Sequence, residues 1–136
     1  MGKVLAIDFG LKRTGIAISD ESHMFAFGLK TVDSKTLDEE LARLVSTEKL
    51  TEIVIGLPKR LNDEDTHITQ NVRILKEVLE KKYPMIQIHL EDERFTSSIA
   101  SKVIHAAGAS KKQKRDKGLI DKVSATIILQ SFLDSK

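Results

Sequence analysis

The spacing of apolar residues changes partway along this 136-residue chain, and that change limits the folds it can form. Three short apolar runs come first, at residues 4–7, 15–18 and 24–29, separated only by turn-forming stretches. They predict three strands that follow one another as an antiparallel meander. Strand-like and helix-like segments then alternate, which predicts parallel pairing with right-handed crossovers.

The alternating part begins with helical spacing over residues 37–45, where Ser34 or Thr36 can serve as the N-cap. Further elements are predicted as strands at 52–58 and 85–93, and as helices at 72–79, 97–108 and 119–133, the last one preceded by Gly118. The predicted order is βββαβαβαα. This order describes an α/β fold, in which a five-stranded mixed sheet carries packed helices and residues 1–136 form one domain.

Composition restricts the class of protein. The chain has no cysteine, which excludes disulfides and thiolate metal sites and favours a cytoplasmic location. No apolar run is long enough to cross a membrane, and no signal peptide precedes the first strand, so we expect no membrane partner. The net charge is only +2, but residues 111–117 hold five basic side chains. This cluster predicts contact with a polyanion, although a solvated loop has the same composition.

Acidic residues end two of the predicted strands. Asp8 lies between Ile7 and Phe9, where burying a lone carboxylate costs several kcal/mol unless a cation compensates it. Sites in such sheets form beyond the carboxyl ends of the parallel strands, where residues 91–93 (Glu-Asp-Glu) also lie. Alternation puts the first and third of these acids on one face and the second on the other. It does not decide which of them faces Asp8.

A further acid comes from the last predicted helix. Asp121 is the first member of an apolar stripe that continues through Ala125, Leu129 and Phe132, so it lies on the side that faces the sheet. The alternative is that Asp121 only caps the helix. Carboxylates that converge on one edge repel each other unless a cation lies between them. Oxygen ligands select Mg²⁺ or Mn²⁺, and two such ions about 4 Å apart suit phosphodiester cleavage.

Four stretches together resemble one bacterial family: "DFGLKRTGIAISD" (8–20), "IVIGLPKRLN" (53–62), "EDERFTS" (91–97) and "IDKVSATIILQSFL" (120–133). They resemble the YqgF/RuvX-like family of ribonuclease H-like Holliday junction resolvases, whose members are also described as pre-16S rRNA nucleases. The resemblance covers nearly the whole chain. Two positions depart from it. Asp63-Glu64-Asp65 stands where the family usually has an Asp-Gly pair, and Ser124 stands where the last helix often has Ala.

The resemblance implies a ribonuclease H-like fold and a metal-dependent endonuclease that hydrolyses phosphodiester bonds of structured nucleic acid in pre-16S rRNA 5′-end processing and ribosome biogenesis. It assigns Asp8, Glu93 and Asp121 as catalytic acids and as ligands of Mg²⁺ or Mn²⁺, and it favours Glu93 over Glu91 and Asp92. Basic residues are predicted to bind the nucleic acid, unless they are merely exposed or, in the case of Arg94, paired with Asp92: Lys12, Arg13, Lys59, Arg60, Arg94, Lys111, Lys112, Lys114 and Arg115.

Other functions remain open at this point. The alternative substrate is a DNA Holliday junction in recombination and repair, since RNA precursors and branched DNA both offer phosphates and bent shapes. A resolvase needs two active sites, yet the sequence shows no extra apolar patch for a dimer, so we expect a monomer or a weak dimer. A non-catalytic nucleic-acid-binding module is a third hypothesis. An actin-like ATPase is a fourth, because its phosphate-binding hairpin resembles "DFGLKRTG", but that class needs two such domains.

Overall fold

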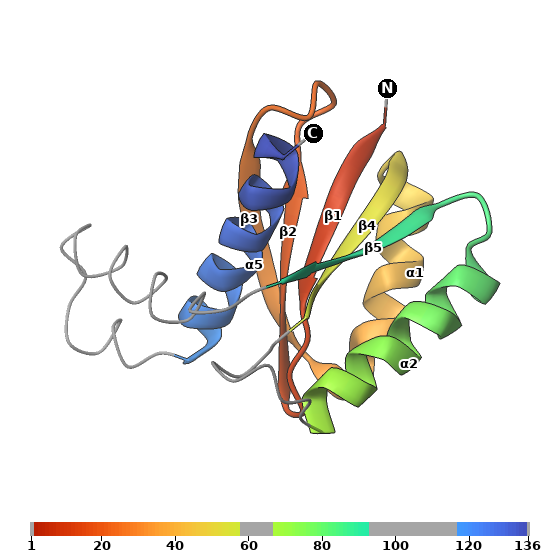
Figure 1. Ribbon diagram of the computed structural model, residues 1–136, viewed down its shortest axis with the longest axis vertical. Helices are drawn as coiled ribbons and strands as arrows, with labels where there is room; N and C mark the ends of the chain where they lie inside the picture. The colour runs from red at the N-terminus through yellow and green to blue at the C-terminus, as the bar shows by residue number, and fades with distance from the viewer. Residues whose placement is uncertain (1, 58–66, 93–116, 136) are drawn as a thin grey trace, which may run out of the picture.

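The strands form one mixed sheet. The computed structural model describes residues 2–57, 67–92 and 117–135, without the side chains of residues 67–69, 92 and 117–121. The strands in these ranges are β1 (Lys3–Asp8), β2 (Arg13–Ser19), β3 (Ala26–Asp33), β4 (Leu50–Leu57) and β5 (Gln87–Asp92). Their spatial order is β3-β2-β1-β4-β5 (Figure 1). The β1–β2 and β2–β3 pairs are antiparallel, and β1–β4 and β4–β5 are parallel, as predicted.

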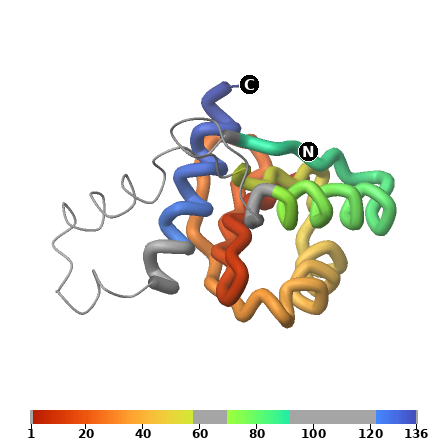
Figure 2. The backbone as a smooth tube through the Cα atoms, turned by 60° about the horizontal axis from the view of Figure 1, so that its bottom comes forward, coloured from red at the N-terminus to blue at the C-terminus, as the bar shows by residue number. Residues whose placement is uncertain are grey.

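Helices cover both faces of this sheet. The described helices are η1 (Ser34–Thr36), α1 (Leu37–Thr47), α2 (His67–Lys82) and α5 (Lys117–Asp134). Figure 2 shows the strands lying between α5 on one side and α1 with α2 on the other. The helix predicted at residues 97–108 lies outside the described residues. No helix in the described ranges is long and apolar enough to cross a membrane.

Alternation along β1 divides the core into two layers. Leu5 and Ile7 are fully buried in the cluster beneath α1 and α2. Val4 and Ala6 are fully buried on the opposite face, with Ala125 and other α5 residues. Each fully buried Val, Leu or Ile side chain contributes about 1.5–3 kcal/mol, so the alternating pattern fixes which face of the sheet each helix covers.

A bulge in β3 places Gly28 and Lys30 on opposite faces of the sheet. Ile16 pairs with Lys30 and Ala17 pairs with Gly28, which leaves Leu29 as an extra residue. Gly28 faces α5, where an added Cβ would lie 3.0 Å from the Thr126 hydroxyl oxygen. Lys30 is turned toward α1, and its ammonium lies 2.9 Å from a carboxylate oxygen of Glu40.

The start of β3 differs from the prediction. We predicted a strand over residues 24–29, but β3 runs from Ala26 to Asp33. Met24 and Phe25 instead lie in the β2–β3 turn, because their amides donate hydrogen bonds of 2.8 and 3.1 Å to the carboxylate of Asp20. A carboxylate that bonds amides four and five residues ahead forms a turn that strand propensity does not reveal.

Of two predicted helix starts, that of α1 is confirmed and that of α5 needs correction. Thr36 is the N-cap of α1 but makes no capping hydrogen bond with its side chain, whereas Asp33 caps the preceding turn by accepting from the Lys35 amide at 2.9 Å. The last helix begins at Lys117, so Gly118 lies inside it instead of preceding it. Glycine disfavours a helix interior by only about 1 kcal/mol, which neighbouring residues can offset.

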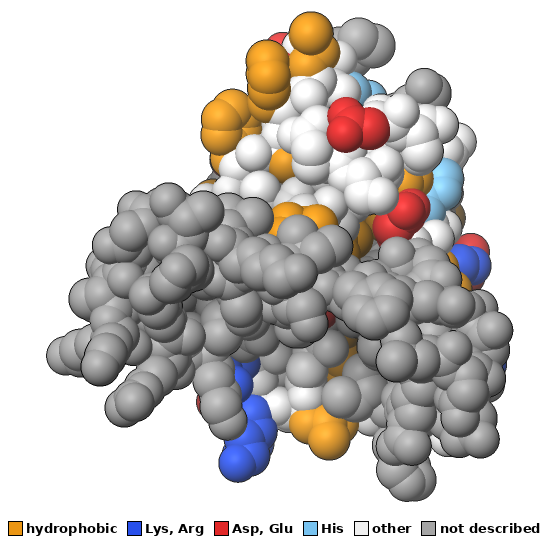
Figure 3. Space-filling model, turned by 60° about the vertical axis from the view of Figure 1, so that its left-hand side comes forward, with side chains coloured by type: hydrophobic (Ala, Val, Ile, Leu, Met, Phe, Trp, Pro, Cys, Tyr) orange, Lys and Arg blue, Asp and Glu red, His pale blue; other side chains and the backbone are white. Residues whose placement is uncertain are grey.

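An apolar patch lies on the outer edge of the sheet, although the sequence had indicated none. Met24, Phe25, Phe27 and Leu29 keep 61%, 58%, 55% and 37% of their surface exposed. Figure 3 shows hydrophobic side chains at the upper end of one face, where the β2–β3 turn lies. The patch depends on the exposure of one edge strand, which single-sequence periodicity does not report.

Candidate active site

Asp8 is the last residue of β1 and is partly buried. Val4 and Ala6 face α5, so alternation places Asp8 on the α5 side of the sheet as well. Its backbone pairs with Gly15 of β2, which fixes the height of the carboxylate at the carboxyl end of the strand. Asp8 therefore lies at the edge of the sheet where the sequence pattern places the end of the first strand.

The hairpin after Asp8 is held from the side by the end of β3. The Ser34 hydroxyl donates a 2.6 Å hydrogen bond to the carbonyl oxygen of Gly10. The Ser34 amide donates a 3.0 Å hydrogen bond to the carbonyl oxygen of Lys12. The fully buried Thr14 hydroxyl lies 2.8 Å from the Ser34 hydroxyl, and it must be the donor there because Ser34 has a single proton to give. Ser34 therefore fixes both ends of the hairpin tip.

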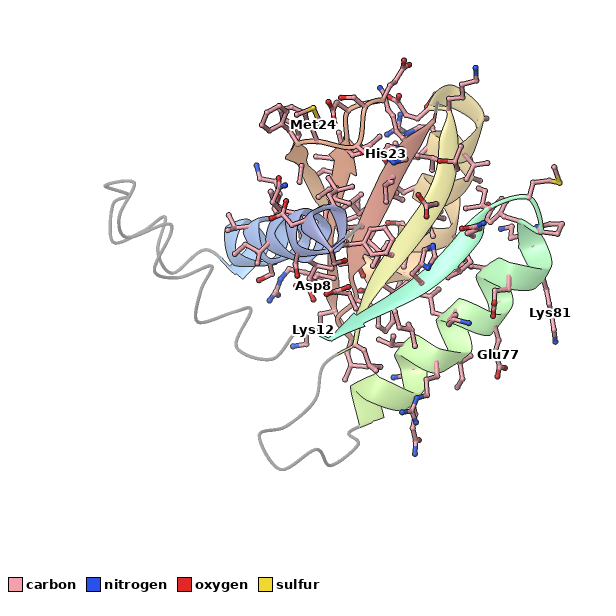
Figure 4. All side chains as sticks on the ribbon, turned by 45° about the horizontal axis from the view of Figure 1, so that its top comes forward. Asp8, Lys12, His23, Met24, Glu77 and Lys81 are labelled. Carbon is pink, nitrogen blue, oxygen red and sulfur yellow. The ribbon has the colours of Figure 1, made fainter. Side chains whose placement is uncertain are left out.

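The predicted basic residues of this hairpin occupy different environments. Lys12 is exposed at the tip, and Figure 4 shows it at the same end of the sheet as Asp8. Arg13 is the first residue of β2 and not part of the turn, and it is only partly exposed. Leu11, between Gly10 and Lys12, is 63% exposed. The tip thus presents one cation and one apolar side chain near Asp8.

The parallel strands β4 and β5 end at the same edge as β1. Ile7 of β1 pairs with Ile55 of β4, and the next residue of β4, Gly56, pairs with Glu91 of β5. Glu91 thus lies two strand spacings, about 10 Å, from β1. Its carboxylate accepts a 3.2 Å hydrogen bond from the Ser131 hydroxyl of α5. Of the three acids at residues 91–93, Glu91 is therefore engaged by the later part of α5.

The remaining predicted residues are only partly covered. Asp121 belongs to α5, one turn before the buried Ala125, and the N-terminal end of α5 lies at the same end of the molecule as the carboxyl end of β1 (Figure 1). Its side chain is not described. The following lie outside the described residues: Glu93, Lys59, Arg60, Arg94, Lys111, Lys112, Lys114 and Arg115. Within the described side chains, no three His, Cys, Asp or Glu residues gather as a metal-binding group.

A second polar cluster lies away from this edge. The His89 imidazole donates a 3.0 Å hydrogen bond from Nε2 to Glu52, and Nδ1 of His23 lies 4.0 Å from the other oxygen of the same carboxylate. His23 also bonds the carbonyl oxygen of Gly2 through Nε2 at 2.6 Å. Figure 4 shows His23 at the opposite end of the sheet from Asp8. The bond between His89 and Glu52 joins β5 to β4, which gives His89 a structural role.

Sequence comparison identifies close relatives. A model of the family described as "RuvX: Holliday junction resolvase" matches residues 2–135. A protein of Bacteroides thetaiotaomicron named "putative pre-16S rRNA nuclease" is 42% identical over 136 residues, with 100% of this chain and 99% of its own length covered. A protein of the same name from Porphyromonas gingivalis is 45% identical over 135 residues, covering 99% and 98%.

Structural comparison adds a more distant neighbour. A structure described as "T. thermophilus RuvC in complex with Holliday junction substrate" superposes with a TM-score of 0.54 at 12% sequence identity. The match covers 99% of this chain and 95% of the other. At this identity, the similarity concerns the arrangement of strands and helices and not individual side chains.

Proposed function

This chain belongs to the RuvX Holliday junction resolvase family and has a ribonuclease H-like fold, and on that premise we propose that it is an endonuclease that cleaves structured nucleic acid with Asp8, Glu93 and Asp121 as its catalytic acids. We propose precursor 16S rRNA as the substrate, because the two relatives that match over nearly their full length, at 42% and 45% identity, are named for a nuclease of that RNA. Working on that RNA would place the protein in the cytoplasm.

One observation carries the site assignment: Asp8 ends β1 on the face of the sheet that α5 covers. A carboxylate at this position lies beyond the apolar layer formed by Val4 and Ala6, at the edge where the parallel strands end. Position 121 of α5 lies one turn before Ala125, which packs in that same layer. Helical spacing therefore favours an approach of Asp121 to this edge.

Alternation in β5 supports Glu93 as the third acid. Ile88 is buried in the α1–α2 layer and Leu90 packs against it, whereas His89 contacts Phe132 of α5 with ring centroids 4.9 Å apart. Odd-numbered positions of β5 thus face α5, and residue 93 would continue this series. Glu91 belongs to the series too, but its carboxylate already bonds Ser131. These relations support Glu93, in line with the family resemblance.

The residues fit a divalent cation. Asp8 offers carboxylate oxygens at a partly buried position, and Glu93 and Asp121 would offer the same donor type, which suits Mg²⁺ or Mn²⁺ better than softer metals. Activation of the attacking water and neutralisation of charge on the leaving oxygen are the chemistry that such an ion supplies. In this proposal, the three acids would hold the ion at the carboxyl end of β1, where the scissile phosphate would meet it.

Basic residues around the edge would hold the nucleic-acid backbone. Lys12 is suited to contact a phosphate next to the scissile bond, because its ammonium is exposed at the hairpin tip near Asp8. Arg13 follows it at the base of β2. The proposed backbone contacts outside the described residues are Lys59, Arg60, Arg94, Lys111, Lys112, Lys114 and Arg115. Such contacts fix orientation and give salt-dependent affinity without reading base sequence.

Cleavage of a Holliday junction is the second candidate, favoured by the description of the matching family and by the junction substrate bound to RuvC in the structural neighbour. Resolution requires two coordinated cuts and therefore two copies of the chain. Processing of a precursor RNA requires only one cut by a monomer or a weak dimer. The number of cuts per binding event therefore separates the two substrates.

A cleavage assay with end-labelled substrates tests the proposal. The wild-type protein is incubated with an RNA spanning the 5′ end of precursor 16S rRNA, and separately with a four-way DNA junction, in Mg²⁺, in Mn²⁺ or in a chelator. We expect metal-dependent cleavage of the RNA at a defined position. Paired symmetric cuts in the junction alone would favour the second candidate, and binding without cleavage of either substrate would favour a non-catalytic module.

A further inference from the structure

The tip of the β1–β2 hairpin is fixed by contacts from outside the hairpin. Ser34, directly after β3, donates from its hydroxyl to the carbonyl oxygen of Gly10 and from its amide to that of Lys12. These two carbonyl groups flank Leu11. A hairpin tip of four residues normally has its conformation set by its own turn, whereas here a residue more than twenty positions away restrains both sides.

The anchor itself is restrained. The hydroxyl of the fully buried Thr14 donates to the Ser34 hydroxyl at 2.8 Å, so a chain of two hydrogen bonds runs from β2 through Ser34 to Gly10. Asp33, the last residue of β3, accepts from the Lys35 amide at 2.9 Å and holds the backbone on the other side of Ser34. The side chain and the amide of Ser34 are thereby both kept in donating positions.

We propose that Ser34 is a positioning residue for nucleic-acid binding, which holds the hairpin tip so that Lys12 meets a backbone phosphate beside Asp8. This inference rests on the proposed function and extends it to a residue that does not touch the substrate. Ser34 acts by restricting the conformations of residues 10–12 before binding, so less conformational freedom is lost when Lys12 contacts the phosphate.

The physical reason lies in the character of lysine. Its ammonium is a point charge on a long flexible stem, so its position is only as well defined as the backbone that carries it. Lys12 is exposed, and its backbone carbonyl is the one that the Ser34 amide holds. Loss of the Ser34 hydroxyl frees the Gly10 side of the tip. The hydrogen bond from the Ser34 amide to the Lys12 carbonyl oxygen stays intact. The effect on binding is therefore expected to be partial and transmitted through Lys12.

A double-mutant cycle between Ser34 and Lys12 tests the inference. Affinity for the labelled precursor RNA is measured at several salt concentrations, with Ca²⁺ in place of Mg²⁺ to prevent cleavage. Lys12→Ala should weaken binding about three- to tenfold and lower the salt slope by about one. Ser34→Ala should weaken binding about two- to fivefold in the wild-type background and less than about 1.5-fold in the Lys12→Ala background, since coupled residues are not additive.

Controls separate positioning from a general loss of structure. Ser34→Thr keeps the hydroxyl and should restore affinity, whereas Ser46→Ala removes a similar 2.9 Å bond, to the Arg43 carbonyl on exposed α1, and should change nothing. If Ser34→Ala does not fold, Ser34→Cys, which keeps the volume with a weak donor, replaces it. Equal effects of the Ser34 variant in both backgrounds would overturn the inference, as would no effect of Lys12→Ala.

The cleavage assay described for the proposed function distinguishes failure of the inference about Ser34 from failure of the proposed function. Additive binding effects together with normal metal-dependent cleavage would reject the role of Ser34 and leave the catalytic assignment standing. Absence of cleavage with a clear coupling between Ser34 and Lys12 would do the reverse.

Discussion

The α-carbon of Gly10 packs directly against the backbone carbonyl group of Arg13 across the β1–β2 hairpin, with no room for a β-carbon between them. This approach closes the turn within the four residues that separate Asp8 from β2. The Gly10 carbonyl oxygen accepts the hydrogen bond from the Ser34 hydroxyl. Gly10, the first of the two glycines in "DFGLKRTG", is thus required for the geometry of the turn that follows the proposed catalytic acid.

Gly10→Ala should therefore destabilise the protein by about 1–3 kcal/mol, because the obstacle is backbone and cannot rotate away. Chemical denaturation of the variant measures this loss. The neighbouring Leu11→Ala, at a side chain that is 63% exposed, should change stability by less than about 0.5 kcal/mol. Equal stability of Gly10→Ala and the wild type would show that the turn can open without cost.

Ser124→Ala should stabilise the protein. Ser124 is 1% exposed in α5, and its hydroxyl has no hydrogen-bond partner among the described residues. A buried hydroxyl without a partner costs about 1–3 kcal/mol, so its removal should raise the free energy of unfolding by about 1 kcal/mol and raise Tm by a few degrees. Thermal unfolding checks this, and a lower Tm would reveal a partner for the hydroxyl.

Glu52→Ala should destabilise the end of the sheet opposite the proposed site. The Glu52 carboxylate accepts from His89 at 3.0 Å and approaches His23, which in turn bonds the backbone of Gly2. Loss of these charge-assisted contacts should cost about 1–2 kcal/mol. Glu48→Ala removes only a partly exposed pair with Lys3 and should cost less than about 1 kcal/mol. The reverse order in denaturation would contradict the structural role of the cluster.

Asp20 makes part of the stability acid-sensitive. The Ser22 hydroxyl, followed by the amides of Phe25 and Met24, lowers the pKa of the Asp20 carboxyl group below its ordinary value. A lowered pKa means that the stabilisation is present at neutral pH and is lost as the pH falls below about 4. NMR titration of Ser22→Ala should show a higher pKa for Asp20 than in the wild type. An unchanged value would remove Ser22 as the cause.

Much of the fold follows from residue periodicity. The alternation in β1 distributes Leu5 and Ile7 to one face and Val4 and Ala6 to the other, which is how the structure arranges them. The position of Asp8 follows as well, because the strand ends and the topology together place it at the carboxyl end of β1, beside the ends of the parallel strands. The β3 start could not be predicted in the same way, since the Asp20 carboxylate competes with strand pairing for the amides of Met24 and Phe25.

The sequence pattern did not predict contacts between segments that are distant along the chain. Ser34 fitted a helix-cap position in sequence, but its hydroxyl bonds Gly10 and Thr14, which periodicity does not bring together. The exposed patch at Phe25 and Phe27 likewise depends on β3 being an edge strand. The roles of Glu93 and Asp121 stay predictions, carried by strand alternation, helical spacing and the family resemblance.

The most direct measurement compares cleavage and binding of the same labelled RNA by the wild type and Asp8→Asn. Asparagine keeps the size of the side chain and removes its charge, so cleavage in Mg²⁺ should fall at least about 100-fold while affinity stays within about threefold. Asp38→Asn, at an exposed acid in the first turn of α1, should cut like the wild type. Undiminished cleavage by Asp8→Asn would mean that the chemistry does not take place at the end of β1.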